Sequence, residues 1–215
     1  MIFSSMAPII IALVMTFASI SSPTTQSTGT ETAALTNDSF LFRNVEWGLS
    51  MTDLIDAVIA EEYENGLTED GYEVYTDKFV LYDLTVGGHT CDAMYFIVGG
   101  QYADGAYILH EEHSNYQLYY SDYTDLVEKY TKKYGPPVSD EKEWIGDSIY
   151  KDKPDKYGMA IALGELQLTT VWEAKDGSKI KIFMSGDNLD ITARIDYTCP
   201  GYANLSNSSS DDEGI

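Results

Sequence analysis

The segment 110–113 reads HEEH and contains the residue types of a metal site. Zinc proteases use a helical His-Glu-x-x-His pattern, which places two imidazoles four residues apart on one helix face. In this chain the two histidines are three residues apart, and they stand at the end of an expected strand. His89 and Cys91 would have to complete such a site. The spacing favours a polar strand end whose acids lie near a helix N-terminus.

Three aspartates, Asp147, Asp152 and Asp155, supply the carboxylate oxygens that calcium prefers. The Asp-x-Asp-x-Asp-Gly spacing of an EF-hand loop is absent, and three lysines alternate with these acids. We therefore interpret the segment as a solvated loop.

Other catalytic patterns are also missing. The chain has no Gly-x-Ser-x-Gly motif, and Cys91 near His89 stands in no recognised catalytic context. The segment 98–101 lacks the lysine and the following helix of a phosphate-binding loop. Nothing selects a catalytic pair among the 35 acids. The sequence thus predicts no catalytic residue, no cofactor and no resident metal ion.

Cys91 and Cys199 are the chain's two cysteines. An exported protein can oxidise them, and a bridge would close a loop of about a hundred residues, which stabilises by ~4 kcal/mol on the chain-entropy model. Two buried free thiols are the alternative. The sequence leaves both open.

The formal net charge of -22 restricts the partners of this protein. Such a polyanion is repelled by nucleic-acid phosphates and by anionic lipid, so nucleic acid is excluded as an expected partner. A basic protein, a cation or a neutral ligand remains, and the charge also keeps an exported protein soluble. Seventeen tyrosines suit either a binding surface or a core beneath helices.

The N-terminal segment predicts export. Residues 7–18 read APIIIALVMTFA, an apolar run that is short for a membrane span and is followed by small residues. We expect a signal peptide over 1–21, cut after Ala18 or Ser21, and no stable membrane insertion after cleavage. The expected location is secreted or cell-envelope-associated. No Lys or Arg precedes Arg43, and a buried strand is the alternative.

Composition divides the rest of the chain. Residues 22–39 read as a Ser/Thr-rich linker, 40–202 as a single α+β domain, and 203–215 as a disordered acidic tail. The triplets that begin at Asn37, Asn204 and Asn207 match the glycosylation acceptor pattern, and their use stays open.

Two helices and eight strands would position any site. One helix is predicted from Ser50, which can cap it, to about Tyr63, and a second from about Asn115 to Tyr134. Four strand-like segments follow each helix. They are 72–76, 79–85, 92–98 and 102–109, then 143–145, 166–174, 179–184 and 190–197. We expect tandem helix-plus-four-strand repeats, about 50–111 and 115–198, in one antiparallel sheet with helices on one face.

The segment 42–55 carries a resemblance. It reads FRNVEWGLSMTDLI and looks like the opening of a group of uncharacterised secreted bacterial proteins, which begin with a strand, Trp-Gly-x-Ser and a capped helix. The stretches 111–115, 133–136 and 185–188 also resemble that group, so the likeness covers most of 40–198. The helix start is similar to lipoproteins of the SmpA/OmlA (BamE-like) type, whose lipidated N-terminal cysteine this chain lacks. The tandem order resembles the β-lactamase-inhibitor-protein fold, which implies binding and carries over no functional residue.

Two functions follow as expectations. The first is an exported acidic binding module that engages a protein, peptide or glycan through its sheet face. The second is an extracellular hydrolase with an unrecognised active site. A polar, tyrosine-rich exposed sheet face would favour binding, whereas a deep pocket of clustered His, Asp or Glu would favour hydrolysis.

Overall fold

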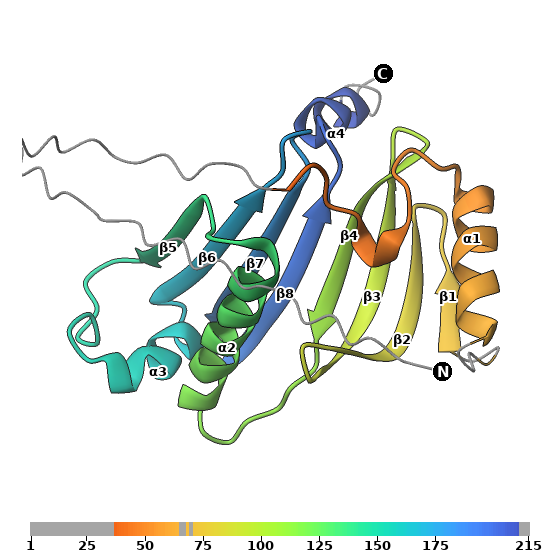
Figure 1. Ribbon diagram of the computed structural model, residues 1–215. Coiled ribbons are helices and arrows are strands. Elements are labelled where there is room, and N and C mark those ends of the chain that lie inside the picture. The colour runs from red at the N-terminus through yellow and green to blue at the C-terminus, as the bar shows by residue number, and fades with distance from the viewer. Residues whose placement is uncertain (1–36, 65–67, 69–70, 211–215) are drawn as a thin grey trace, which may run out of the picture. The chain divides into compact units, whose positions relative to one another are not determined.

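The computed structural model describes residues 37–64, 68 and 71–210, and within them the chain forms one antiparallel sheet of eight strands (Figure 1). The strand order is β1-β2-β3-β4-β8-β7-β6-β5. Two meanders, β1–β4 and β5–β8, therefore meet where β4 pairs with β8. The strands are Tyr72–Val74, Lys78–Val86, His89–Val98, Gln101–Leu109, Ser139–Trp144, Leu166–Glu173, Lys179–Asp187 and Asp190–Thr198.

In the described part of the chain, four α-helices accompany the sheet, so the α+β class and the single antiparallel sheet are confirmed. The two predicted helices are α1 and α2, and two more are present that the sequence did not predict. The helices are α1 Met51–Glu64, α2 Gln117–Tyr134, α3 Tyr157–Ala162 and α4 Tyr202–Ser210, with short 3-10 turns η1 Phe42–Asn44 and η3 Pro154–Lys156.

Helix α1 begins where the sequence placed it. Ser50 Oγ accepts a hydrogen bond from the backbone N–H of Asp53 at 3.3 Å and donates one to the Asp53 carboxylate at 2.7 Å. This cap satisfies one of the N–H groups that an α-helix leaves free in its first turn.

Replacing Ser50 with Ala should lower the free energy of unfolding by about 1 kcal/mol, because the Asp53 N–H loses its acceptor. Urea denaturation of both proteins measures the difference. Thr52→Ala, an exposed change in the first turn, is the control and should have a smaller effect. Equal losses in the two variants would show that the cap does not stabilise α1.

One face of the sheet, which we call the covered face, is packed under α1, α2 and α3. Helix residues such as Leu54, Leu126 and Ile161 belong to the same buried cluster as alternate strand residues. Phe42, fully buried in η1, packs against the rings of three tyrosines at centroid distances of 4.8 to 5.3 Å. The buried tyrosines of this cluster are Tyr95, Tyr102, Tyr107, Tyr123, Tyr130 and Tyr197.

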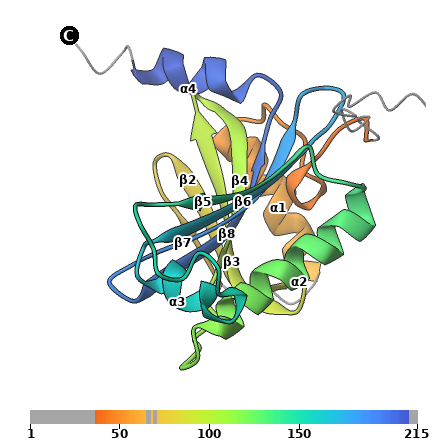
Figure 2. The same cartoon turned by 90° about the vertical axis from the view of Figure 1, so that its left-hand side faces the viewer.

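The tail differs from the prediction. The sequence predicted disorder from residue 203, whereas α4 occupies Tyr202–Ser210; residues 211–215 lie outside the described part. Its Ser/Asn-rich sequence has low helix propensity, so contacts with the sheet explain the helix better. In Figure 2 this helix lies apart from α2 and α3. Tyr202 reaches Asp104 on the sheet face opposite the covered one, so the expectation that all helices share one face holds only for α1, α2 and α3.

A β-bulge in β4 sets the direction of its side chains. Phe96 pairs with Asp104 and Ile97 with Tyr102, so Ala103 is an extra residue on β4. Without the bulge, Tyr102 and Asp104 would point to the same face. With it, Tyr102 packs on Tyr95 in the core while Asp104 points to the other face.

Candidate functional site

The sheet face turned away from α1, α2 and α3, here called the outer face, contains a cavity of about 390 Å³. Its lining comes from the centre of the sheet, where the two meanders join, and from the start of α4. Three of the chain's 13 cations and two buried aspartates meet there. The lining residues are Asp104, Val171, Lys179, Lys181, Arg194, Asp196, Thr198 and Tyr202.

Asp196 is held by two cations within this cavity. Arg194 donates from Nε to Asp196 Oδ1 at 2.6 Å, and its Nη2 lies 2.5 Å from the same oxygen. Lys181 Nζ lies 3.0 Å from Asp196 Oδ2, an ion pair without hydrogen-bond geometry. Because the Asp196 side chain is only 3% exposed, water screens these pairs weakly.

Asp104 differs from Asp196 because no cation holds it. In the described part of the chain, no Lys, Arg or His nitrogen forms an ion pair with it, and its buried Oδ1 has no hydrogen-bond partner. Burial, with a smaller contribution from the Asp196 charge, raises the pKa of Asp104 to about 6, although a hydrogen bond from Tyr202 opposes the shift. A buried acceptor without a donor is costly, so this oxygen is suited to meet a ligand.

A second cavity of about 300 Å³ lies beside the first. Lys179, Thr198 and Tyr202 line both, so Tyr202 stands where the two cavities adjoin. The second cavity also contains Cys199, whose thiol pKa is raised by burial and by the Asp104 charge. A raised thiol pKa lowers the thiolate fraction, which argues against a nucleophilic role for Cys199.

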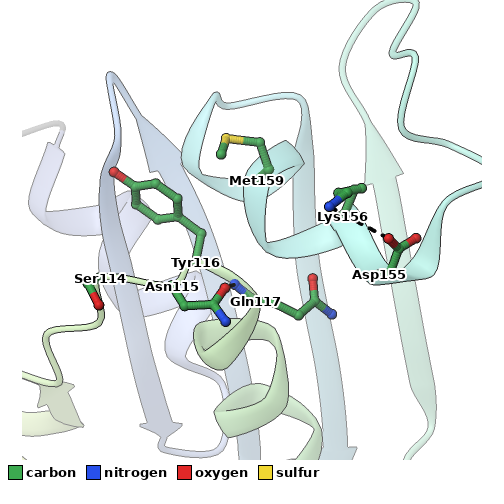
Figure 3. Close-up of a pocket in the computed structure, with 7 residues that line it drawn as sticks. All are labelled: Ser114, Asn115, Tyr116, Gln117, Asp155, Lys156 and Met159. Carbon is green, nitrogen blue, oxygen red and sulfur yellow. Dashed lines mark hydrogen bonds and ion pairs between the residues drawn. The ribbon is translucent and has the colours of Figure 1, made fainter.

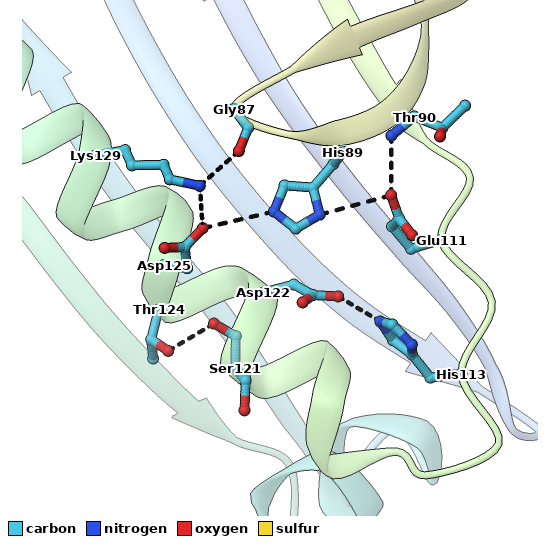
Figure 4. Close-up of polar contacts among 10 residues, drawn as sticks. All are labelled: Gly87, His89, Thr90, Glu111, His113, Ser121, Asp122, Thr124, Asp125 and Lys129. Atoms are coloured by element: carbon cyan, nitrogen blue, oxygen red, sulfur yellow. Dashed lines mark hydrogen bonds and ion pairs between the residues drawn. The ribbon is translucent and has the colours of Figure 1, made fainter.

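The three histidines each meet a carboxylate instead of a common centre. His89 lies 3.7 Å from both Glu111 and Asp125 (Figure 4). His113 lies 2.5 Å from Asp122, a contact that Figure 4 also shows. Two of the histidines therefore contact acids of α2, His89 through Asp125 and His113 through Asp122.

His110 contacts Asp92 at 2.8 Å. Across the described residues, no three His, Cys, Asp or Glu side chains are arranged to hold a metal ion. Glu111 brings the 110–113 segment next to His89, but the described residues of this segment, His89 and Cys91 do not form the ligand cluster that a zinc site would need.

A smaller cavity of about 220 Å³ lies where α2 begins, beside η3 and α3 (Figure 3). Gln117 connects these elements, since its side chain donates to the Pro154 carbonyl and accepts from the Gly158 N–H, both at 3.1 Å. Asp155 lines the cavity and pairs with Lys156 at 3.7 Å. Both polar ends of Gln117 are used in packing, so we regard this cavity as structural.

The two cysteines are free in the structure. Cys91 pairs across the sheet with Leu109, and the Cys199 N–H bonds to the Ala103 carbonyl. Leu109 lies six positions after Ala103 along β4, which places the thiols roughly 20 Å apart. Of the two alternatives that the sequence left open, the structure contains two buried thiols, because a disulfide needs much closer Cα atoms.

Two thiols per chain should therefore react with Ellman's reagent in guanidinium without reductant. In the native protein the reaction should be slow, because both side chains are buried and burial raises the pKa of Cys91 to about 11. Absorbance of the released thionitrobenzoate measures both. A chain without reactive thiols after denaturation would contradict the separation described above.

Sequence reasoning missed Asp104 and Asp196 because both are ordinary acids within strands. The buried tyrosines lie in the covered-face core, which is the second of the two placements that the sequence left open for them. The tyrosine that reaches the outer-face cavity comes from α4. One sequence signal could have indicated the bulge that turns Asp104 outward. The order Tyr-Ala-Asp in 102–104 breaks the alternation of apolar and polar residues in β4.

Within the described residues, no helix is long and apolar enough to cross a membrane. The predicted signal peptide and most of the predicted linker lie outside the described residues. A scan against protein-family models found no match to this chain, and neither the search of curated proteins nor that of solved structures found one.

Proposed function

We propose that this protein is a binding module that takes a small ligand, or a side chain of a larger partner, in the outer-face cavity. The observation that supports this proposal is the buried Asp104 oxygen without a partner in a cavity of about 390 Å³. That volume lies within the range of known ligand sites. A donor on the ligand would complete the hydrogen bonding of this carboxylate.

The ionised Asp104 side chain destabilises the folded chain, which supports a functional role for it. A carboxylate whose pKa is raised to about 6 is less stable ionised in the folded chain than in the unfolded chain. An amide or apolar side chain would avoid that cost at the same place. Destabilising polar groups in cavities occur preferentially at functional sites.

Binding fits the charges better than hydrolysis does. Hydrolysis by paired carboxylates needs one acid and one carboxylate that can reach the substrate. Asp104 could serve as the acid, but Arg194 and Lys181 contact both oxygens of Asp196, which is buried. The hydrolase remains the second candidate because two acids share the cavity.

Ligand-induced thermal stabilisation tests this function. We expect a ligand from a panel of short peptides, sugars and amino acids to raise the melting temperature of the full chain at pH 7.5. At a hundredfold excess over Kd, such a ligand adds about 2.7 kcal/mol to stability. Asp104→Asn should reduce the ligand-induced shift, whereas Asp190→Asn, an exposed acid on β8, should keep it.

Equal shifts in both variants would place the ligand elsewhere and contradict the proposed site. Hydrolysis of a panel compound that is lost in Asp104→Asn and in Asp196→Asn would favour the second candidate.

We further propose that the two halves are structural repeats, as the resemblance to the tandem β-lactamase-inhibitor-protein order implies. Each half has a helix followed by a four-stranded meander, although α3 interrupts the second half between β5 and β6. The paired last strands β4 and β8 would then lie on an approximate two-fold axis beside the cavity. Export to the cell envelope or beyond belongs to the same proposal, and an intact Met1 on secreted protein in mass spectrometry would contradict cleavage.

A further inference from the structure

A row of side chains crosses the outer face at the cavity. Asp104 on β4 is opposite Thr198 on β8, and Thr198 is opposite Lys179 on β7. Lys179 is in turn opposite Glu173 on β6. Neighbouring strands lie about 4.8 Å apart, so the backbones of Asp104 and Lys179 are separated by roughly 10 Å. All but Glu173 line the cavity.

Two residues of this row, Asp104 and Lys179, carry opposite charges that the protein itself pairs only weakly. The buried Asp104 oxygen has no hydrogen-bond partner. The Lys179 side chain is 50% exposed, and its ammonium is 3.4 Å from Glu173. An exposed pair of this kind contributes little and exchanges partners readily. The other two cations of the cavity are already engaged by Asp196.

The charge balance restricts the ligand. Lys179, Lys181 and Arg194 carry three positive charges, and Asp104, Asp196 and Glu173 carry three negative ones when all are ionised. A purely cationic ligand would meet three cations, and a purely anionic one would lie against an unpaired carboxylate. A ligand with one charge of each sign avoids both costs, because it adds no net charge to the cavity.

We propose that the outer-face cavity binds a small zwitterion of the α-amino-acid class, with its ammonium group on Asp104 and its carboxylate on Lys179. This inference rests on the ligand-binding function proposed above. The ammonium supplies the N–H donors that Asp104 Oδ1 lacks, and the long Lys179 side chain covers the remaining distance along the row. Val171 and the ring of Tyr202 offer apolar contact for the rest of the ligand.

Isothermal titration calorimetry of the full chain at pH 7.5 with the α-amino acids tests the inference. The amino acid that binds with the highest affinity is then compared with its amide, its N-acetyl form and its N-trimethyl form. The amide lacks the carboxylate, the N-acetyl form lacks the positive charge of the ammonium group, and the N-trimethyl form lacks the N–H donors. We expect each to bind at least about tenfold more weakly, the effect of losing one charged contact.

Two variants assign the ends of the ligand. Lys179→Met should weaken binding of the amino acid about tenfold but should not weaken binding of its amide, because only the amino acid has a carboxylate. Asp104→Asn should weaken binding of the amino acid and reduce the difference in affinity between the amino acid and its N-acetyl form. Lys175→Met, an exposed lysine in the β6–β7 turn, is the control and should bind normally.

The outcomes separate this inference from the proposed function. If a sugar or an amide binds as tightly as any amino acid, and its binding depends on Asp104, the proposed ligand class is wrong but the proposed binding function is supported. If no compound of any charge class binds through Asp104, the proposed function fails and this inference fails with it. Affinity for the amino acid should also fall as the pH drops below about 6, because a protonated Asp104 no longer attracts the ammonium group.

Discussion

Asp104→Asn is expected to stabilise the protein at neutral pH by roughly 2 to 3 kcal/mol. The pKa of Asp104 is raised from 3.8 to about 6 by burial and by the neighbouring Asp196 charge. Between those values the folded chain binds more protons than the unfolded chain, so this group's contribution to stability falls as the pH rises through that window. An asparagine does not ionise, so the variant avoids the loss.

Urea denaturation from pH 4 to pH 8 measures this effect. The free energies of unfolding of the two proteins should agree near pH 4, separate between about pH 4 and 6, and stay apart at higher pH. Asp190→Asn, an exposed acid on β8, should change stability by less than about 0.5 kcal/mol throughout. A pH-independent difference between Asp104→Asn and the parent protein would show that the Asp104 charge is not the cause.

Phe42→Ala should cost about 3 to 5 kcal/mol of unfolding free energy. The Phe42 ring is fully buried and lies between Tyr95, Tyr107 and Tyr197 at centroid distances of 5.0, 4.8 and 5.3 Å. Its removal leaves a cavity in the middle of the covered-face core and ends three aromatic contacts. The midpoint and slope of urea unfolding measure the loss.

Gly105 gives this prediction a matched control. A Cβ built on Gly105 would lie 2.3 Å from Phe42 Cδ1, so Gly105→Ala alone should destabilise the protein by overpacking. In the Phe42→Ala background the added methyl group enters space that the ring has left. The double variant should therefore lose less stability than the sum of the two single variants. Strict additivity would contradict the contact between Phe42 and Gly105.

Local patterns in the sequence were enough to predict the main elements. The Ser50 cap and the apolar stripe that follows it predicted α1, and the Gly-Pro-Pro sequence after Tyr134 predicted the end of α2. Both signals act between residues a few positions apart. Alternating strands and turn signals likewise predicted eight strands and an antiparallel sheet, because each hairpin is specified by neighbouring residues.

The short helices α3 and α4 depend on packing instead. Gly158 at the start of α3 lets the backbone of Tyr116 approach so closely that an added Cβ would be 2.1 Å from its carbonyl oxygen. Six residues are too few for a stable isolated helix, so α3 forms only against its neighbours. The same dependence on the sheet explains why the tail sequence alone predicted disorder where α4 lies.

The sequence by itself determined the acidic charge, the α+β composition and the antiparallel strand pattern. The tertiary structure decided the candidate site, because Asp104, Asp196 and Lys179 come from three strands whose order no local signal specifies. A single extra residue in β4, Ala103, turns Asp104 away from the core. Burial then changes an ordinary acid into one with a raised pKa, and burial is a property of the packed sheet and not of any short stretch of sequence.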